Sequence, residues 1–447
     1  MTISPFDSPM LGALFADDEI AALFADDAVI SSMLLVESAL ASAQARAGMI
    51  PQDTARRIAD ACRDFHPDPK SLAAGTASAG VPVPALVKAL KAELPRADAR
   101  HVHFGATSQD VVDTALVLRL RDAMGILRRR IRKLIRALIK LADEHRDTVM
   151  AGRTRSQQAV PTTFGLKVAG WLAPLVRIDG RLEDLSQDLF RLSFGGAAGT
   201  LASLGPRAET VERYLAGELE LEIAEMPWHS QRDILVEFAA KLTALTGALG
   251  KMGQDLVLLA QSEIAEVQPG KGGGSSTMPH KSNPVQAEML VTLARFNATQ
   301  ISSLYHAQIH EHERSGSAWL LEWLALPQII MACGAALAQA CDMVPDLRVN
   351  AGRMRDNLEL SEGAMLAEAA TFALSDHVGR DEADRLVKAA LIQSASHGGN
   401  LFDELPKLTD APVDWNEVRD PANYTGQAGL YIDRVIGAAH RALAENG

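Results

Sequence analysis

Residues 272–284 hold the side chains best suited to chemistry in this chain of 447 residues. Three glycines precede three hydroxyl residues at 275–277, and Lys281 and Asn283 add a cation and an amide. Glycine gives the backbone freedom to take positive φ, and closely spaced N–H groups, hydroxyls and a cation suit an anion. The pattern therefore favours a mobile loop that closes over an anionic ligand. A plain flexible linker between two helices is the alternative.

A second polar stretch, residues 103–115, contains Thr107, Ser108 and Asp110 just before an apolar run. Hydroxyl and carboxyl residues in this position are typical of a helix start, where free N–H groups also suit a carboxylate ligand. Ser108 or Asp110 could instead only cap the helix. The stretch thus predicts a helix beginning near Thr107, with Thr107 and Ser108 as neutral donors to substrate.

A third stretch, residues 152–164, begins Gly-Arg-Thr and contains Arg155 and Gln157. An arginine stays protonated at any working pH, so Arg155 is unsuited to shuttling protons. Its planar guanidinium can hold a carboxylate through two parallel hydrogen bonds. The composition of this stretch therefore predicts substrate binding.

These three stretches resemble the signature motifs of the fumarase/aspartase superfamily, and the resemblance extends over nearly the whole chain. The glycine-rich loop is not a phosphate-binding P-loop, because Lys281 follows His280 and no strand pattern precedes it. The resemblance implies an all-α fold and homotetramers with a twenty-helix core. It also implies active sites shared between subunits, each built from three stretches in three different chains.

The resemblance also assigns roles to individual residues. Ser275 matches the catalytic serine of the superfamily, while Lys281 and Asn283 match its contacts to the substrate carboxylate. Ser275 is the predicted proton relay, with His280 or Lys281 as alternatives. Arg155 departs from the pattern, since the adenylosuccinate and argininosuccinate lyases carry an acid/base histidine there, so an amine-releasing mechanism is in doubt.

Residues 310–323 narrow the choice within the superfamily. Arg314 is a further candidate for substrate binding, and Trp323 stands where adenylosuccinate lyases carry a phosphate-binding arginine. The wording of this stretch, and the residues around Arg232, resemble the bacterial 3-carboxy-cis,cis-muconate cycloisomerases. Arg232 either contacts substrate or pairs with Asp233.

Three histidines in the same region raise the question of a metal. His306 and His310 are four residues apart and His312 lies close, so a metal site is conceivable. No His-Glu-x-x-His pattern is present, and the superfamily uses no catalytic metal. We therefore expect neither a metal nor a cofactor.

The elements that must position these residues are long helices. Apolar residues recur at alternating spacings of three and four in two segments, which predicts long helices packed along a seam. The seams comprise Leu120, Met124, Leu127, Ile131, Leu134, Leu138 and Leu141 in one segment, and Leu235, Phe238, Leu242, Leu245, Leu249, Met252, Leu256 and Leu259 in the other. We predict an all-α protein with a helical N-terminal domain (1–105), a central bundle and oligomer core (106–350) and a helical C-terminal domain (351–447).

Composition limits the partners and the compartment. A net charge of −12 argues against nucleic acid, so an anionic substrate must be drawn by a local cluster of cations. No uninterrupted run of 18 apolar residues predicts a membrane span, and we expect no signal peptide. The three cysteines form no disulfide framework, and Cys333 and Cys341 are expected in the core. A reducing cytoplasm fits these features.

The resemblance implies a cycloisomerase that converts 3-carboxy-cis,cis-muconate to its lactone in aromatic degradation. A sulfonate analogue of the substrate fits the same arginines. A fumarate-releasing lyase of the adenylosuccinate lyase type is the first alternative. A structural protein that retains the lyase scaffold without activity is the alternative from another class.

Overall fold

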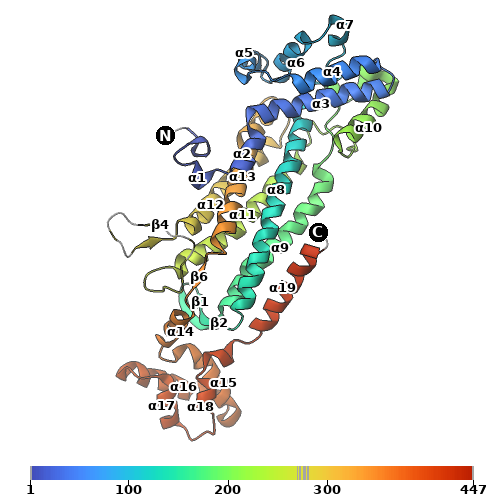
Figure 1. The fold of residues 1–447 in the computed structure, drawn as a ribbon. Coiled ribbons are helices and arrows are strands. Elements are labelled where there is room, and N and C mark those ends of the chain that lie inside the picture. The colour runs from blue at the N-terminus through green and yellow to red at the C-terminus, as the bar shows by residue number, and fades with distance from the viewer. Residues whose placement is uncertain (1–2, 269, 271–272, 275–277, 279–280, 445–447) are drawn as a thin grey trace. The chain divides into compact units, whose positions relative to one another are not determined.

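A computed structural model describes residues 3–268, 270, 273–274, 278 and 281–444. The described chain is almost entirely helical (Figure 1), with three small two-stranded antiparallel sheets that pair β1 with β2, β3 with β6, and β4 with β5. The predicted all-α class is confirmed.

The helices before residue 105 are short, apart from one. Their bounds are α1 Gly12–Phe15, α2 Asp18–Phe24, α3 Asp26–Arg46, α4 Gln52–Asp64, α5 Pro69–Ala79, α6 Val83–Ala92 and α7 Arg96–Ala99. Proline occupies the first turn of α5 and α6, where its missing N–H costs no hydrogen bond.

Five long helices form the middle of the chain. They are α8 Ser108–Glu144, α9 Phe164–Leu189, α11 Asp233–Leu259, α12 Val285–Ala307 and α13 Ser317–Met343, with the shorter α10 Ala208–Leu219 between α9 and α11. Both predicted seams are confirmed: the residues in α11 are all buried, and in α8 only Leu141 is partly exposed. Burial of these stripes, more than intrinsic propensity, stabilises such helices.

The strands and the C-terminal helices complete the fold. The strands are β1 Val149–Thr154, β2 Gln157–Thr163, β3 Val267–Gln268, β4 Gly273–Gly274, β5 Ser282–Asn283 and β6 Arg348–Val349. The helices are α14 Ala351–Glu359, α15 Ala367–Val378, α16 Arg380–His397, α17 Leu401–Leu408, α18 Trp415–Val418 and α19 Ala428–Ala444. Helices α15, α16 and α17 share an apolar core that includes Leu374, Leu386 and Phe402.

The chain divides into two compact units. One comprises Met1–Arg130, Ile178–Gly247 and Leu293–Ala338, and the other comprises Ile131–Arg177, Ala248–Thr292 and Gln339–Gly447. The division falls within each of the five long helices. The three-domain boundaries expected from the sequence stay a prediction.

Buried side chains include groups whose chemistry is then unused. Cys333 and Cys341 lie in the core as expected, and Cys62 is also buried. Burial raises the pKa of the Cys62 thiol to about 12, with a further contribution from Glu37, so this thiol stays protonated.

Two helices, α3 and α13, are long and apolar enough to span a membrane by length and composition alone. In each, 61% of the apolar window is buried inside the protein, as in the core helix of a soluble protein. Their hydrophobicity is therefore accounted for by packing within the fold.

Candidate functional site

The start of α8 carries the first predicted stretch. The helix begins at Ser108, as expected, and the N–H of Thr107 donates to Asp110 Oδ2 at 2.8 Å. This is the return half of a capping box, in which a side chain three residues into the helix accepts from the cap residue. Thr107 and Ser108 are half-buried.

Asp110 does more than cap α8. Its buried carboxylate also accepts from the N–H groups of Gly195 at 2.8 Å and Gly196 at 3.0 Å, and lies 2.7 Å from His229 Nε2. Gly196 has φ of +67°, and a Cβ there would meet the carbonyl oxygen of Gly105 at 3.2 Å. Asp110 therefore fixes a glycine-dependent loop and a histidine against the start of α8.

Beneath this helix start lies a buried ionic cluster centred on Arg232. Its guanidinium bonds to both oxygens of Asp113 at 2.6 and 3.1 Å and to both oxygens of Glu322 at 2.8 and 2.6 Å. Burial by itself lowers the pKa of Arg232, but the two carboxylates outweigh it, so the pKa is raised. The pairing with Asp233 considered from the sequence is wrong, because Asp233 is exposed at the start of α11.

Arg314 joins this cluster to the start of α8. Its Nε donates to Gln109 Oε1 at 2.8 Å, and one terminal nitrogen lies 3.3 Å from the carbonyl oxygens of Gly196 and Ala197. Gln109 in turn donates to Asp113 at 3.0 Å, and Asp113 also accepts from Trp319 Nε1 at 3.0 Å. The structure thus brings Arg314 to the stretch that holds Thr107 and Ser108.

His310 lies at the edge of the same cluster. Its side chain is buried, its Nε2 is 3.6 Å from Glu322 Oε1, and neither ring nitrogen has a hydrogen-bond partner. Helix α12 ends at Ala307, so His306 and His310 do not share a helical face, and His306 is exposed. Within the described ranges, no three His, Cys, Asp or Glu side chains gather as metal ligands.

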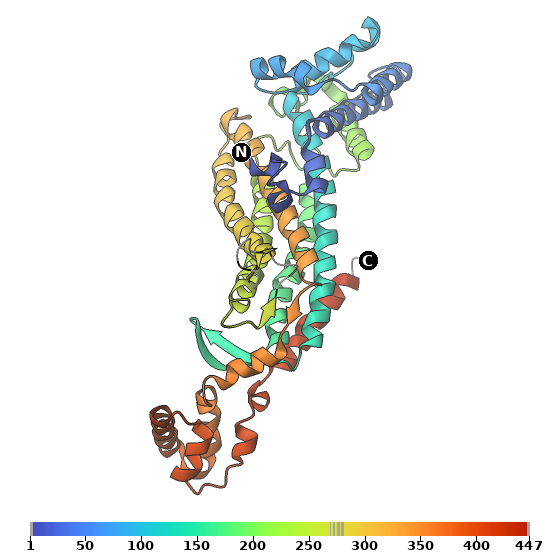
Figure 2. The ribbon, with the colours of Figure 1, turned by 60° about the vertical axis from the view of Figure 1, so that its left-hand side comes forward.

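The second predicted stretch is the hairpin β1–β2, which lies beside α14 (Figures 1 and 2). Arg155 and Ser156 form its two-residue turn, with φ of +51° and +64°, between the paired residues Thr154 and Gln157. Such turns favour Asn-Gly, so an Arg-Ser pair stores backbone strain. Arg155 and Gln157 are both exposed on this turn.

Arg153, two residues earlier, is committed to the fold. Its guanidinium bonds to both oxygens of the buried Glu266 at 2.9 and 2.6 Å, and Asn357 donates to the same carboxylate at 2.8 Å. The two arginines of the stretch therefore differ in role: Arg153 anchors the hairpin, and no bond within the described residues engages the Arg155 side chain.

The third predicted stretch is the loop joining β4 to β5. Gly273 pairs with Asn283 and Gly274 with Ser282, so the two ends of the loop are held together. Lys281 is exposed and Asn283 is half-buried. Ser275 and His280, the predicted relay residues, lie outside the described residues.

Comparison with known proteins identifies the family. A family model described as lyase matches residues 15–301. A 3-carboxy-cis,cis-muconate cycloisomerase of Pseudomonas aeruginosa is 43% identical over 425 residues, which cover 93% of this chain and 92% of the relative. The chain belongs to the lyase family. The predicted superfamily and the resemblance to cycloisomerases are confirmed.

Two solved structures of this lyase family show how far the likeness extends. The 3-carboxy-cis,cis-muconate lactonizing enzyme of Pseudomonas putida superposes with a TM-score of 0.92 at 39% identity, covering 98% of this chain and all of that one. A fumarate lyase of Mesorhizobium sp. BNC1 gives a TM-score of 0.89 at 39% identity, covering 95% and 98%. The fumarase/aspartase-type fold is therefore shared over the whole chain.

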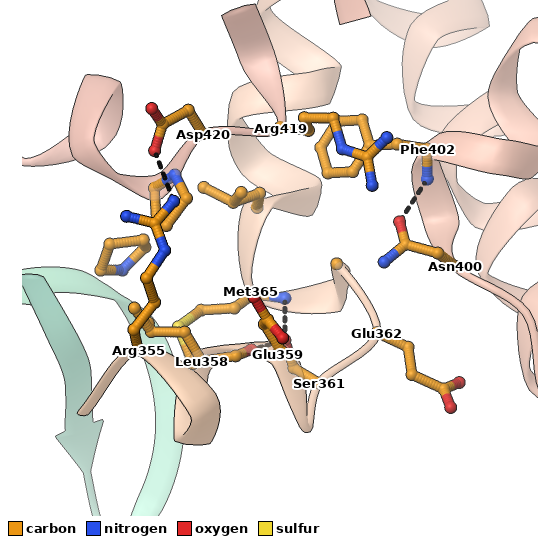
Figure 3. A pocket seen from close by; sticks show the side chains of 14 residues that line it. Arg355, Leu358, Glu359, Ser361, Glu362, Met365, Asn400, Phe402, Arg419 and Asp420 are labelled. Atoms are coloured by element: carbon orange, nitrogen blue, oxygen red, sulfur yellow. Dashed lines mark hydrogen bonds and ion pairs between the residues drawn. The ribbon is translucent and has the colours of Figure 1, made fainter. Parts of the chain in front are cut away.

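A cavity of about 570 Å³ lies between β2, α14 and the loops that follow (Figure 3). Arg355 faces Asp420 across it at 3.7 Å, and Arg419, Glu359 and Glu362 also line it. Two guanidiniums against three carboxylates leave an excess of negative charge, which disfavours a polyanion. This cavity is therefore a poor candidate for the substrate site of a lyase that binds carboxylates.

The sequence motifs included Asp110, Asp113, Trp319 and Glu322 without revealing what they do. A charged residue within an otherwise apolar helical run, such as Asp113 after Val111 and Val112, was the available signal. A buried charge requires a partner, but the sequence could not name Arg232 as that partner.

Proposed function

We propose that this protein catalyses the lactonisation of 3-carboxy-cis,cis-muconate without a metal or cofactor. The observation that carries the proposal is Arg155, exposed on a strained turn where the fumarate-releasing relatives place an acid/base histidine. A permanent cation there suits binding of an additional carboxylate and is unsuited to proton transfer. The cycloisomerases among the relatives support the same reading.

The reaction is an intramolecular addition. One carboxylate oxygen of the substrate attacks the far alkene carbon and forms the C–O bond of a five-membered lactone. The displaced π electrons move to the carbon beside another carboxylate, which becomes enolate-like and then takes a proton. The protein must hold the trianion in the reactive conformation, stabilise the developing charge and deliver that proton.

The residues divide between these tasks. Arg155, Lys281, Arg314 and Asn283 are proposed to hold the three carboxylates, with Thr107, Ser108 and Gln157 as neutral donors. Ser275 is proposed to deliver the proton, with Lys281 or His280 as alternatives. Asp110 and the Arg232 cluster support the donors at the start of α8 through contacts already described.

The proposal extends to the assembly and the setting. Three stretches carry these residues, and we propose a homotetramer in which each active site takes one stretch from each of three subunits. We further propose a cytoplasmic enzyme of the β-ketoadipate pathway, which degrades protocatechuate. Its partner would then be a small tricarboxylate, with no nucleic acid or membrane involved.

The alternative is a fumarate-releasing lyase, which the likeness to the fumarate lyase structure favours. Arg155 and Trp323 argue against it in its adenylosuccinate form, because the proton-transfer histidine and the phosphate-binding arginine are both replaced. Release of fumarate from adenylosuccinate would establish this alternative.

Ultraviolet absorbance tests the proposal directly. Purified protein is mixed with 3-carboxy-cis,cis-muconate without added metal or cofactor. Lactonisation interrupts the conjugated diene, so the absorbance band should fall as product forms. A constant absorbance with folded protein would overturn the proposal, and a parallel assay with 4-sulfomuconate would rank the two substrates.

A further inference from the structure

A second cavity, of about 400 Å³, lies between α3, α8 and α13 and contains one nearly buried arginine. Its walls are mainly apolar, from Phe24, Val29, Met33, Pro82, Val112, Leu116, Trp323, Leu326 and Pro327. Its charged lining residues are Asp26, Arg119 and Glu322. A volume of this order suits a small organic ligand, and apolar walls with one fixed charge are typical of such sites.

Arg119 is 9% exposed and has no carboxylate partner among the described residues. Its Nε donates to the carbonyl oxygen of Ala115 at 3.2 Å, and its guanidinium carbon lies 5.4 Å from the centre of the Phe24 ring. No hydrogen bond or ion pair engages its two terminal nitrogens within the described ranges. Burial lowers the pKa of Arg119 to about 10, still high enough for it to carry a charge at neutral pH.

Comparable arginines in this protein are all neutralised. Arg232 has two carboxylates, Arg128 pairs with Asp179 at 3.0 Å, Arg130 pairs with Asp17, and Arg153 pairs with Glu266 at 2.6 Å. A buried charge without a partner is costly, which makes Arg119 an exception to be explained. An anionic ligand in the cavity would supply the missing partner.

The other two charged groups do not fill that role. Both oxygens of Glu322 already accept from Arg232, and Asp26 is exposed in the first turn of α3. Glu322 and Trp323 belong to the same turn of α13, so the cavity wall is continuous with the ionic cluster beneath the start of α8.

We propose that this cavity is a second binding site, distinct from the proposed catalytic site, for a small apolar monocarboxylate of about the size of benzoate. Its carboxylate pairs with the terminal nitrogens of Arg119, and its apolar body packs against Val112, Leu116 and Trp323. A ligand held there contacts the residue next to Glu322, so it is placed to influence the cluster that supports Arg314.

Tryptophan fluorescence with benzoate as the probe tests this site without relying on catalysis. Benzoate should quench the emission in a saturable way, and benzamide, of the same shape but neutral, should bind at least about tenfold more weakly because a charge-assisted hydrogen bond is lost. Equal binding of benzoate and benzamide, or no binding of benzoate, would overturn the proposal.

Three variants locate the site. Arg119→Leu, which suits an apolar wall, should weaken benzoate binding at least about tenfold while the protein stays folded. Val29→Phe should exclude benzoate by filling the cavity, and it keeps the test valid if Arg119→Leu does not fold. Lys281→Met, in the proposed catalytic site, should leave benzoate binding unchanged; loss of binding in that variant would place benzoate at the catalytic site and reject this one.

Discussion

Charged residues in this protein serve two opposite purposes, and their burial separates them. Arg153 and Arg232 are neutralised inside the fold, whereas Arg155 and Lys281 are exposed and retain their charge for a ligand. A protein with a net charge of −12 can bind a trianion only where such cations gather locally. The chemistry at the residue scale therefore depends on which cations the fold leaves unpaired.

Replacing Arg155 tests its proposed grip on substrate. Arg155→Lys keeps the charge but loses the paired hydrogen bonds, so KM should rise about tenfold with little change in kcat. Steady-state kinetics measures both constants. Ser156→Gly, at the neighbouring strained position, is the matched control and should leave KM close to wild type. An unchanged KM in Arg155→Lys would remove this residue from the binding site.

Replacing Ser275 tests the proposed proton relay. Ser275→Ala should lower kcat by about a hundredfold or more, because a positioned proton donor contributes on that order. Ser282→Ala, a serine at the end of the same loop, should retain most of the activity. Circular dichroism would show that both variants are folded. Near-normal turnover in Ser275→Ala would transfer the role to Lys281 or His280.

Breaking the buried cluster should cost stability. Asp113→Ala leaves Arg232 with one carboxylate and Trp319 without an acceptor, so the free energy of unfolding should fall by about 3 kcal/mol or more. Urea denaturation measures the change. Glu237→Gln removes an exposed partner of Lys241 and should cost no more than about 0.5 kcal/mol. Equal effects of the two changes would mean that the cluster does not hold this part of the fold.

At the scale of elements, each functional stretch lies at the end or turn of a regular element. Thr107 and Ser108 are at the start of α8, Arg155 is at the turn of β1–β2, and Lys281 and Asn283 flank and form β5. Element ends leave backbone groups free for a ligand, while the packed interior of the element fixes their positions.

Helix α7 is held to α4 by an ionic contact that depends on pH. Asp98 accepts from Arg57 at 2.7 and 2.8 Å and from Thr54 at 2.8 Å. The hydrogen bond from Arg57 is the main cause of a lowered pKa for Asp98, about 2 in the folded state. In the unfolded chain an aspartate titrates near about 4.

The lowered pKa fixes the sign of the pH effect. The contact stabilises the folded protein above pH about 4, and this contribution is lost as the pH falls toward about 2. Asp98→Asn should therefore be less stable than wild type at pH 6, with a difference that shrinks below pH 4. Urea midpoints measured between pH 2.5 and pH 6 would show this. A difference independent of pH would refute the role of the charge.

At the scale of the whole molecule, the proposed active site requires more than one chain. The five long helices bury their seams within the fold, and the three functional stretches lie in separate parts of the sequence. The proposed homotetramer would assemble one stretch from each of three subunits. Light scattering should give the mass of four chains, and a monomer with full activity would contradict the shared site.

Mixing two inactive variants tests the sharing itself. Thr107→Val and Ser275→Ala alter different stretches, so mixed tetramers should contain some sites with both stretches intact. Random assortment predicts recovery in about a quarter of the sites. The activity of the two proteins after joint refolding, compared with each refolded alone, measures this. No recovery in confirmed mixed tetramers would place both stretches of a site in one chain.

The sequence determined the helices and the chemistry-bearing stretches of this protein. Apolar spacing alone predicted the seams of α8 and α11, because a helix is a local structure whose buried face repeats every three or four residues. Motif wording identified the family and selected Thr107, Ser108, Arg155, Lys281 and Asn283 for the site, whose roles stay predictions.

Only the tertiary structure decided which charges meet. Asp113 and Arg232 are 119 residues apart in the chain, and nothing in their spacing names them as partners. The sequence suggested Asp233 for Arg232, whereas packing enclosed the guanidinium between Asp113 and Glu322. The same packing left Arg119 without a carboxylate in an apolar cavity. Long-range pairing depends on how helices pack, and that is a property of the whole fold that local sequence does not encode.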